Sequence, residues 1–306
     1  MKVIYLGTPE FAVAPLKAII NSHHQVVGVV TQPDRPVGRK GVITPPPVKV
    51  VATQSDIPVF QYEKIRAQGV EDLKSLGADI MITCAYGQIL SREIIDICKF
   101  GIINIHGSLL PKYRGAAPIQ YAVINGEEKT GITIMQTEEG LDSGDILAVF
   151  ETSIGETETA ADLFERLSVL GADNIVSVLD KIELGCVSPT KQDHSQATMV
   201  KTIKKEDALI DFSKSATEIK NLINGMNPWP VAFTFKNGKK IKFYRARVAQ
   251  GEGKKGEVIL ADKKLIIACG DGAVEILSLQ EEGGKVMDAI AYLNGRKLKV
   301  GDILGE

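Results

Sequence analysis

The sequence predicts an α/β protein, with a mostly parallel sheet in an N-terminal domain and a smaller all-β domain after it. Three observations lead to this prediction. Short apolar strands alternate with amphipathic helices over the first part of the chain. A polar segment without a repeated period follows, and short strands separated by turn residues come after it. At 306 residues the chain is long enough for two domains.

The first domain is expected to span residues 1–189. We expect strands at 2–7, 25–31, 78–87, 101–106, 131–137 and 145–153, and helices at 9–20 and 159–182. Near-continuous apolar strands between helices indicate a sheet that is covered on both faces, which favours a parallel, Rossmann-like arrangement. The last two strands lie close together in the sequence, so they fit an antiparallel addition to that sheet.

The second domain is expected to follow a linker at 190–205, where the sequence is polar and aperiodic. Apolar residues at helical spacing predict a helix at 215–226, which the motif NPWP ends. Several short strands follow, and KNGK is typical of a tight hairpin. This pattern predicts a small, OB-like β-barrel over residues 206–306.

Composition excludes several classes of protein. No apolar run reaches the roughly 18 residues that a membrane span needs, and the N-terminal MKVIYLGTPEF is typical of a first strand rather than a signal peptide. The four cysteines form no CxxC pair, which predicts reduced thiols in a cytoplasmic protein, and no metal is expected because the histidines lack ligand spacing. The LGTPEF stretch lacks the glycine pattern of a dinucleotide site. A monomer is expected.

Polar residues interrupt the apolar run of the strand at 101–106. Asn104 and His106 alternate with isoleucines, so they share one face at the carboxyl end of the strand, where open α/β sheets bind ligands. A lone histidine here would more simply be a core residue bonded to the backbone, but the paired asparagine and the following Gly107 favour a site. Asp142, between Gly140 and Gly144, is the candidate carboxylate partner; the alternative is an ordinary Asx turn.

Charge is distributed unevenly along the chain. The net charge of −2 combines a balance of −7 over residues 1–200 with +5 over residues 201–306. The stretch KNGKKIKFYRAR (236–247) has six cationic residues and no acidic one. An exposed hairpin face would have this composition, and so would a surface that follows nucleic-acid phosphates.

These motifs together resemble the folate-dependent formyltransferases from end to end of the chain. HGSLLPKYRGAAPIQYAVINGE and GLDSGD carry the resemblance to the superfamily, and LGTPEFAVAPL, TQPDRPVGRK and NPWPVAFTF narrow it to the tRNA-modifying branch. The resemblance implies 10-formyltetrahydrofolate as the formyl donor. It implies as acceptor the α-amine of methionine esterified to initiator tRNA, and thus a role in translation initiation.

The resemblance also implies roles for particular residues. The catalytic residues would be Asn104, His106 and Asp142, and Ser108, Leu109, Leu110 and Pro111 would line the folate site. The tRNA contacts would be Arg39, Lys40 and then Arg35 in the loop at 32–49, with Lys239, Lys240, Lys242 and Arg245 on the barrel.

The chemistry of formyl transfer fits these residue types. The formyl oxygen gains negative charge as the amine adds, and Asn104 and a protonated His106 could both donate hydrogen bonds to it, each worth about 3 kcal/mol. A nearby Asp142 would favour the charged histidine and help to remove a proton from the amine. A free α-amine has a pKa near 8, so only about a tenth of it is nucleophilic at pH 7.

Two other functions remain open from the sequence. A formyltransferase that acts on a small amine, such as an amino-sugar nucleotide or glycinamide ribonucleotide, would share the catalytic residues and the folate site. A non-catalytic RNA- or nucleotide-binding protein would have no use for the three polar residues. The basic loop and the positive C-terminal balance favour the tRNA enzyme.

Overall fold

The computed structural model describes residues 1–38, 41–295 and 298–305, and the chain forms two compact units. Unit 1 contains residues 1–115, 131–152 and 164–199, and unit 2 contains residues 116–130, 153–163 and 200–306. The boundaries predicted from sequence, 1–189 and 206–306, stay predictions. The compact units divide the chain differently, because two short segments before residue 189 pack with the second unit.

Unit 1 is built on a sheet with the strand order β10-β9-β7-β6-β1-β2-β5. The strands are β1 (Lys2–Gly7), β2 (Gln25–Thr31), β5 (Val59–Gln61), β6 (Ile80–Cys84), β7 (Ile102–His106), β9 (Lys129–Gln136) and β10 (Ile146–Ser153). Parallel pairing runs from β5 through β2, β1 and β6 to β7, and β9 is antiparallel to β7. The predicted mostly parallel sheet is confirmed; β5 was not predicted.

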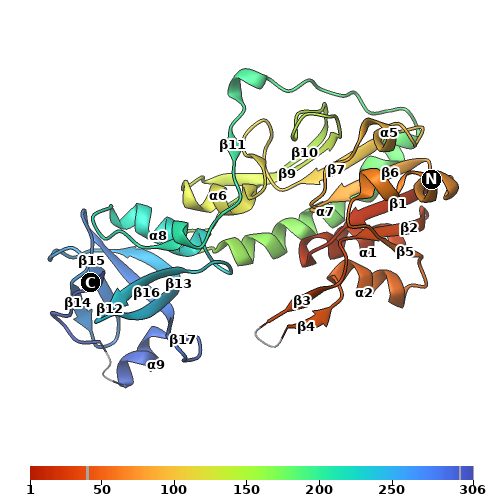
Figure 1. Ribbon diagram of the computed structural model, residues 1–306. Helices are drawn as coiled ribbons and strands as arrows, with labels where there is room; N and C mark the ends of the chain where they lie inside the picture. Colours follow the sequence, from red (N-terminus) through yellow and green to blue (C-terminus); the bar gives the residue numbers. More distant parts are fainter. Residues whose placement is uncertain (39–40, 296–297, 306) are drawn as a thin grey trace. The chain divides into compact units, whose positions relative to one another are not determined.

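Helices cover both faces of this sheet (Figure 1). On one face, α7 (Ala160–Glu183) packs with α1 (Val13–Ile20), since Gly171 lies against Ile105 of β7 and Pro15 of α1. The short helices α3 (Ile65–Gln68), α4 (Val70–Ser75) and α5 (Arg92–Ile95) contribute to the core on the other face, which includes Ile102 of β7. Alternation along β7 therefore places Asn104 and His106 on the face of Ile102, opposite Ile105.

The remaining elements of unit 1 are short. η1 (Glu10–Ala12) precedes α1, and α2 (Pro47–Gln54) follows the exposed hairpin of β3 (Arg35–Val37) and β4 (Val42–Thr44). Part of the predicted linker is ordered: it contains η2 (His194–Gln196) and β11 (Met199–Val200), which pairs with β8 (Arg114–Gly115).

Unit 2 contains an antiparallel sheet with the order β12-β13-β16-β15-β14, and β17 pairs with β16. The strands are β12 (Ala232–Lys236), β13 (Lys239–Ala249), β14 (Val258–Ala261), β15 (Leu265–Ala268), β16 (Ala273–Glu281) and β17 (Met287–Asp288). Asn237 and Gly238 join β12 to β13 with positive φ angles of 49° and 74°, as the KNGK motif predicts. The C-terminal residues connect the two edges of this sheet. The N–H of Gly305 donates to the carbonyl oxygen of Phe235 in β12, and the N–H of Leu304 donates to that of Gly256, just before β14.

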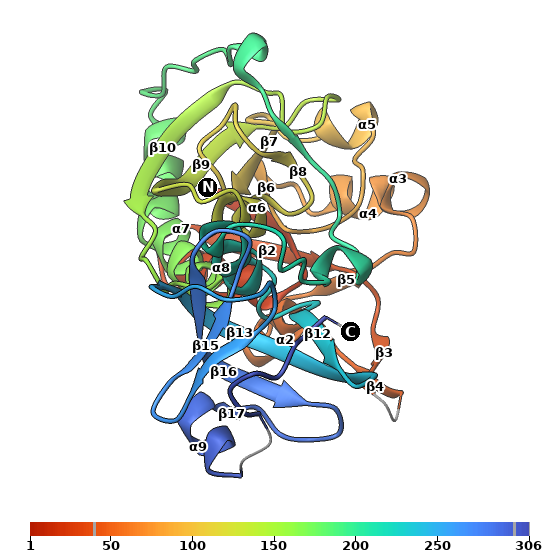
Figure 2. The same ribbon diagram turned by 90° about the vertical axis from the view of Figure 1, so that its left-hand side faces the viewer.

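Helices and an apolar core complete unit 2. η3 (Glu206–Ala208) precedes α8 (Ala216–Gly225), which begins with a capping box between Ser215 and Glu218, and α9 (Ala289–Asn294) packs against β16 (Figure 2). α6 (Pro118–Ile124) packs closely on α8, because a Cβ at Gly225 would lie 2.4 Å from Cγ1 of Ile124. This close packing explains why residues 116–130 belong to the second unit.

Candidate active site

β7 presents Asn104 at the carboxyl end of the parallel sheet. The hydroxyl of Thr83, on the neighbouring strand β6, donates to Oδ1 of Asn104 at 2.9 Å. This bond fixes the orientation of the side-chain amide, because Oδ1 accepts from Thr83 and the NH2 group faces away from it. Asn104 is half-buried, so its amide is a hydrogen-bond donor at the mouth of the sheet.

His106 is held by a backbone carbonyl. Its Nε2 lies 3.0 Å from the carbonyl oxygen of Tyr113, and that oxygen can only accept, so Nε2 carries the proton. The other ring nitrogen, Nδ1, faces Oδ2 of Asp142 at 3.7 Å. Both side chains are largely buried, and the structure thus brings together two residues that are far apart in sequence.

A tight loop positions Asp142. Its Oδ2 accepts a 2.8 Å hydrogen bond from the backbone N–H of Gly115, and its own backbone has a positive φ of 47°. Gly144 is required here, since a Cβ at this position would lie 1.9 Å from the carbonyl oxygen of Gln136. A Cβ at Gly140 would lie 2.2 Å from Oγ of Ser143. Gly144 therefore allows the close approach to the sheet edge that the sequence suggested, whereas Gly140 lies against a side chain of its own loop.

Gln192 supports this loop and was not identified from sequence. Its Nε2 donates to the carbonyl oxygens of Asp142 and Gly144 at 3.0 and 2.7 Å, and its Oε1 accepts from the guanidinium of Arg114. Gln192 is buried although it lies in the segment predicted to be a linker. The polar sequence around Gln192 gives no sign of this role. The role follows only from the fold, which brings Gln192 beside the loop of Asp142.

The four residues expected to line a folate site differ in their surroundings. Ser108 and Leu110 are buried: Oγ of Ser108 donates to the carbonyl oxygen of Lys112, and the N–H of Leu110 donates to the hydroxyl of Thr133. Leu109 and Pro111 are half-buried. Their predicted contact with folate stays a prediction.

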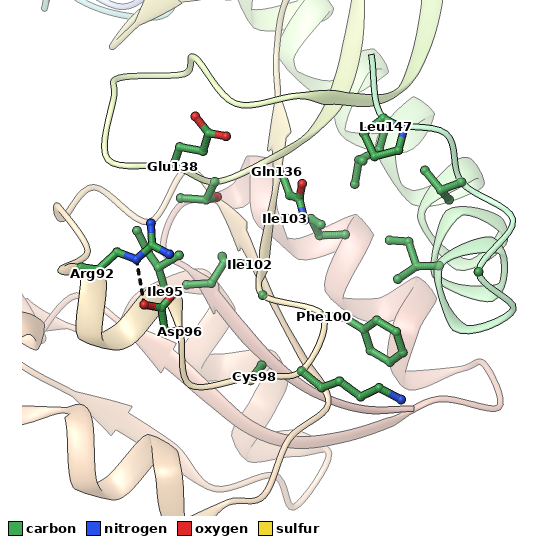
Figure 3. A pocket seen from close by; sticks show the side chains of 17 residues that line it. Arg92, Ile95, Asp96, Cys98, Phe100, Ile102, Ile103, Gln136, Glu138 and Leu147 are labelled. Atoms are coloured by element: carbon green, nitrogen blue, oxygen red, sulfur yellow. Dashed lines mark hydrogen bonds and ion pairs between the residues drawn. The ribbon is translucent and has the colours of Figure 1, made fainter. Parts of the chain in front are cut away.

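A cavity of about 610 Å³ opens at the other end of β7, between α5, the end of β9 and α7 (Figure 3). Ile95, Ile102 and Phe100 give it apolar walls, while Arg92 and Glu138 lie at its edge, the former paired with Asp96. Thr137 also lines the cavity, and its buried hydroxyl has no hydrogen-bond partner among the residues that the structure describes. A bound molecule with a polar edge and flat apolar faces would fit these surroundings.

The predicted tRNA contacts of the loop at 32–49 are only partly visible. Arg39 and Lys40 lie outside the described residues. Arg35 is exposed on β3 and forms an ion pair with Glu63. The hairpin beside it exposes Val37 and Ile43 to solvent.

The predicted contacts on β13 have different environments. Lys239 is exposed and Lys242 is half-buried, whereas Nζ of Lys240 lies 4.1 Å from the centroid of the Phe233 ring. Arg245 makes two hydrogen bonds to the carboxylate of Asp162, at 2.9 and 2.8 Å. Its guanidinium is therefore already engaged within unit 2.

The Arg245 contact changes the acidity of its partner. Burial raises the pKa of Asp162, but hydrogen bonds from Thr159 and Arg245 outweigh it and leave the pKa below its usual value. Thr159 donates through both its backbone N–H and its hydroxyl, at 2.9 and 2.8 Å. These bonds favour the charged carboxylate, so Arg245 and Asp162 form a structural ion pair.

Within the described part of the chain, no helix has the length and apolar content needed to cross a membrane.

The fold and the site together define a class of protein. Residues 1–179 match the formyl transferase family, and residues 202–297 match the formyl transferase C-terminal domain. The chain belongs to the formyl transferase family.

The chain is also similar to individual relatives over its full length. Relatives named methionyl-tRNA formyltransferase, from Citrifermentans bemidjiense and Lachnospira eligens, are 45% and 46% identical to this chain. The matches span 308 and 315 residues and cover all of this chain and 97% and 100% of the relatives. An N-formyltransferase from Helicobacter canadensis, solved with folinic acid and dTDP-3-aminofucose, has a TM-score of 0.67 at 20% identity. That match covers 92% of this chain and 100% of the other, and it shows a shared fold.

Proposed function

We propose that this protein transfers a formyl group from 10-formyltetrahydrofolate to the α-amine of methionine on initiator tRNA, which gives N-formylmethionyl-tRNA for translation initiation. One observation carries the proposal: relatives named methionyl-tRNA formyltransferase match the chain from end to end, through both the catalytic and the C-terminal domain. The arrangement of Asn104, His106 and Asp142 supports it, because these groups suit addition of an amine to a carbonyl.

The cavity at Ile102 is our candidate for the pteridine ring of the donor. Ile102, whose side chain lies on the same sheet face as Asn104 and His106, lines this cavity, and it is two residues from Asn104, or about 7 Å along the strand. The unpartnered hydroxyl of Thr137 supplies a hydrogen bond at its wall. Thr137 also precedes the loop of Asp142, so this placement would bring the reacting end of the donor toward all three polar residues.

When the donor is bound, the amine would add to its formyl carbon and the formyl oxygen would gain negative charge. The bond from that carbon to the folate nitrogen would then break, and the folate nitrogen would take up a proton as it leaves. The NH2 group of Asn104, oriented by Thr83, donates to that oxygen. His106 in its charged form donates from Nδ1, since its Nε2 proton is already bound to the carbonyl oxygen of Tyr113. Neither donor needs to reorient, which keeps the cost of stabilising the charge low.

Asp142 has two roles in the proposed reaction. Its carboxylate lies 3.7 Å from Nδ1 of His106 and places a negative charge beside the imidazole. It also accepts, directly or through a water, the proton that the attacking amine must lose. The bond from the N–H of Gly115 keeps the carboxylate in place for both roles.

Basic residues of both units are candidates for holding the tRNA. Arg35, with Arg39 and Lys40 beyond the described residues, would contact the acceptor end from the loop at 32–49. Lys239, Lys240 and Lys242 would contact phosphates from β13, while the Lys240 side chain covers the Phe233 ring. Arg245 is the weakest of these candidates, because Asp162 already neutralises it.

A place in translation initiation implies the cytoplasm, and we propose that the enzyme acts there as a monomer. The four cysteines are free thiols, and three of them are buried, as expected in a reducing compartment.

A comparison of acceptors tests the proposal. The protein is incubated with 10-formyltetrahydrofolate and, in separate reactions, methionyl initiator tRNA, glycinamide ribonucleotide and an amino-sugar nucleotide. Formylation of the tRNA is expected, with uncharged tRNA as the control. Formylation of only a small amine would contradict the assignment and favour the alternative enzyme. Normal donor binding with no transfer to any acceptor would favour a non-catalytic binding protein.

A further inference from the structure

A cluster of histidines and carboxylates lies where the segment before β2 meets the end of α7 in unit 1. It consists of His23, His24, Asp180 and Glu183, and one ligand atom from each lies within 4.8 Å of the others. Oδ1 of Asp180 is 2.8 Å from Nε2 of His23 and 3.1 Å from Nε2 of His24. The formyl transfer chemistry uses none of these residues.

One atom of the cluster lacks a hydrogen-bond partner. The side chain of His24 is fully buried, and its Nε2 makes no hydrogen bond within the described part of the chain. The Asp180 carboxylate is near, but the two groups are not aligned for a hydrogen bond. The other ring nitrogen of His24, Nδ1, faces the Met1 amino group at 3.1 Å. Nε2 is thus the nitrogen of this ring that is aimed toward Asp180 and His23. An unpaired polar atom at full burial is costly, which points to a missing partner.

We propose that this cluster binds a zinc-class divalent cation through Nε2 of His23 and His24, Oδ1 of Asp180 and the carboxylate of Glu183. Two imidazoles and two carboxylates form a donor set that suits tetrahedral Zn²⁺, in which neighbouring ligand atoms are about 3.4 Å apart. The distances between ligand atoms of the cluster run from 2.8 Å to at most 4.8 Å, a range that includes this value. The side chains of His23, Asp180 and Glu183 are partly exposed, so small rotations of these side chains can complete the coordination shell of the ion.

The scaffold favours this arrangement. Asp180 and Glu183 are three residues apart on α7, so their side chains project from the same side of the helix. Oε1 of Glu183 accepts from the Met1 amino group at 3.3 Å, while Oε2 faces the His24 ring. The bound ion would tie the start of β2 to the end of α7 and stabilise unit 1. Sequence spacing did not reveal the cluster, since its two halves are separated by about half of the chain.

Metal binding by the full chain tests the proposal. Isothermal titration with ZnCl₂ would be done on the reference protein and on its His23→Ala and Asp180→Asn variants. Both substituted positions are partly exposed, and circular dichroism would check that the variants are folded. All proteins would carry Cys186→Ser, because Cys186 is an exposed thiol close to the cluster in sequence and could bind zinc itself. The matched controls are Asp173→Asn, an exposed carboxylate of the same helix, and His194→Ala, an exposed histidine elsewhere.

We expect one zinc ion per chain, binding at least about tenfold weaker in His23→Ala and in Asp180→Asn and unchanged in the two controls. Zinc should also raise the thermal midpoint of the Cys186→Ser protein but not that of the two cluster variants. Absence of binding in the Cys186→Ser background would overturn the proposal. Equal binding by the cluster variants and the controls would overturn it as well.

Discussion

Asp142 is 3.7 Å from Nδ1 of His106, yet its Oδ2 atom is hydrogen bonded to the backbone N–H of Gly115 and not to the imidazole. The backbone therefore fixes the carboxylate independently of the protonation state of the histidine. This arrangement leaves Nδ1 of His106 directed at the site, since Nε2 is bound to the Tyr113 carbonyl.

Replacing Asp142 with asparagine should lower kcat by about 10²-fold or more, because the proton acceptor and the charge beside His106 are both lost. The asparagine oxygen can still accept from Gly115, so the loop should keep its conformation. Steady-state kinetics with methionyl initiator tRNA measures the effect, and equilibrium binding of the folate should be unchanged. A variant with normal kcat would show that the carboxylate has no part in proton transfer.

Asn104→Ala should lower kcat by about 10²- to 10³-fold, as expected for the loss of one donor to the developing oxyanion. Thr83→Val keeps the asparagine but removes the hydroxyl that orients its amide, so a smaller loss of about tenfold is expected. The ratio of the two effects is the informative quantity. Equal kcat values for Thr83→Val and the unaltered protein would mean that Thr83 does not position Asn104.

Gln192→Ala should reduce kcat by about 10- to 100-fold with little change in the KM for the tRNA, since two hydrogen bonds to the Asp142 loop disappear. Gln196→Ala is the matched control, because Gln196 is an exposed glutamine of the same segment whose amide bonds to Asp193. Comparable losses in the two variants would indicate a general disturbance of the segment. A change confined to KM would also contradict a positioning role.

Lys239→Ala and Lys242→Ala should each weaken tRNA binding and reduce the slope of log K against log salt by about 0.7–0.9, as expected for one lost phosphate contact. Arg245→Ala should leave the slope nearly unchanged and instead destabilise the protein by about 1 kcal/mol, because its partner is Asp162. Filter binding at several salt concentrations and urea unfolding separate the two effects. A reduced slope in Arg245→Ala would place that residue on the tRNA surface.

Asp162 should contribute to stability only while it is ionised. Its pKa in the folded protein lies below the ordinary value of 3.8, so its contribution is complete above that value and is lost as pH falls through the lower folded pKa. The urea midpoint should therefore fall between pH 5 and pH 3 by less in Asp162→Asn than in the unaltered protein. An identical pH dependence in the two proteins would show that the Thr159 and Arg245 bonds do not favour the charged form.

The sequence predicted most of the first sheet correctly, for a physical reason. Strands buried on both faces, such as β6 and β7, are nearly continuous apolar runs, and the two polar residues in β7 stood out against that background. β5 was missed because it has only three residues, all half-buried, which are too few to give a periodic pattern. The KNGK hairpin was predicted because its turn needs two positive φ angles, and Asn-Gly supplies them at low cost.

Other features had no signal in the sequence. Gln192 lies in a polar, aperiodic stretch, and its two bonds to the Asp142 loop depend on a chain reversal that no local pattern encodes. Arg245 looked like one more cation in a basic strand, but the fold places Asp162 against it. Residues 116–130 and 153–163 were expected to belong with the first domain, and the close contact of Gly225 with Ile124 shows the first of these packing in unit 2.

The sequence by itself determined the class of fold, the succession of its strands and the identity of the three polar residues of the candidate site, because burial and turn geometry restrict which residues can occupy those positions. Only the tertiary structure decided which groups face one another: Asp142 beside His106, Thr83 beneath Asn104, Asp162 on Arg245 and two histidines against the end of α7. Such pairings join residues that are distant in the chain, and their geometry is set by packing, which local sequence does not specify.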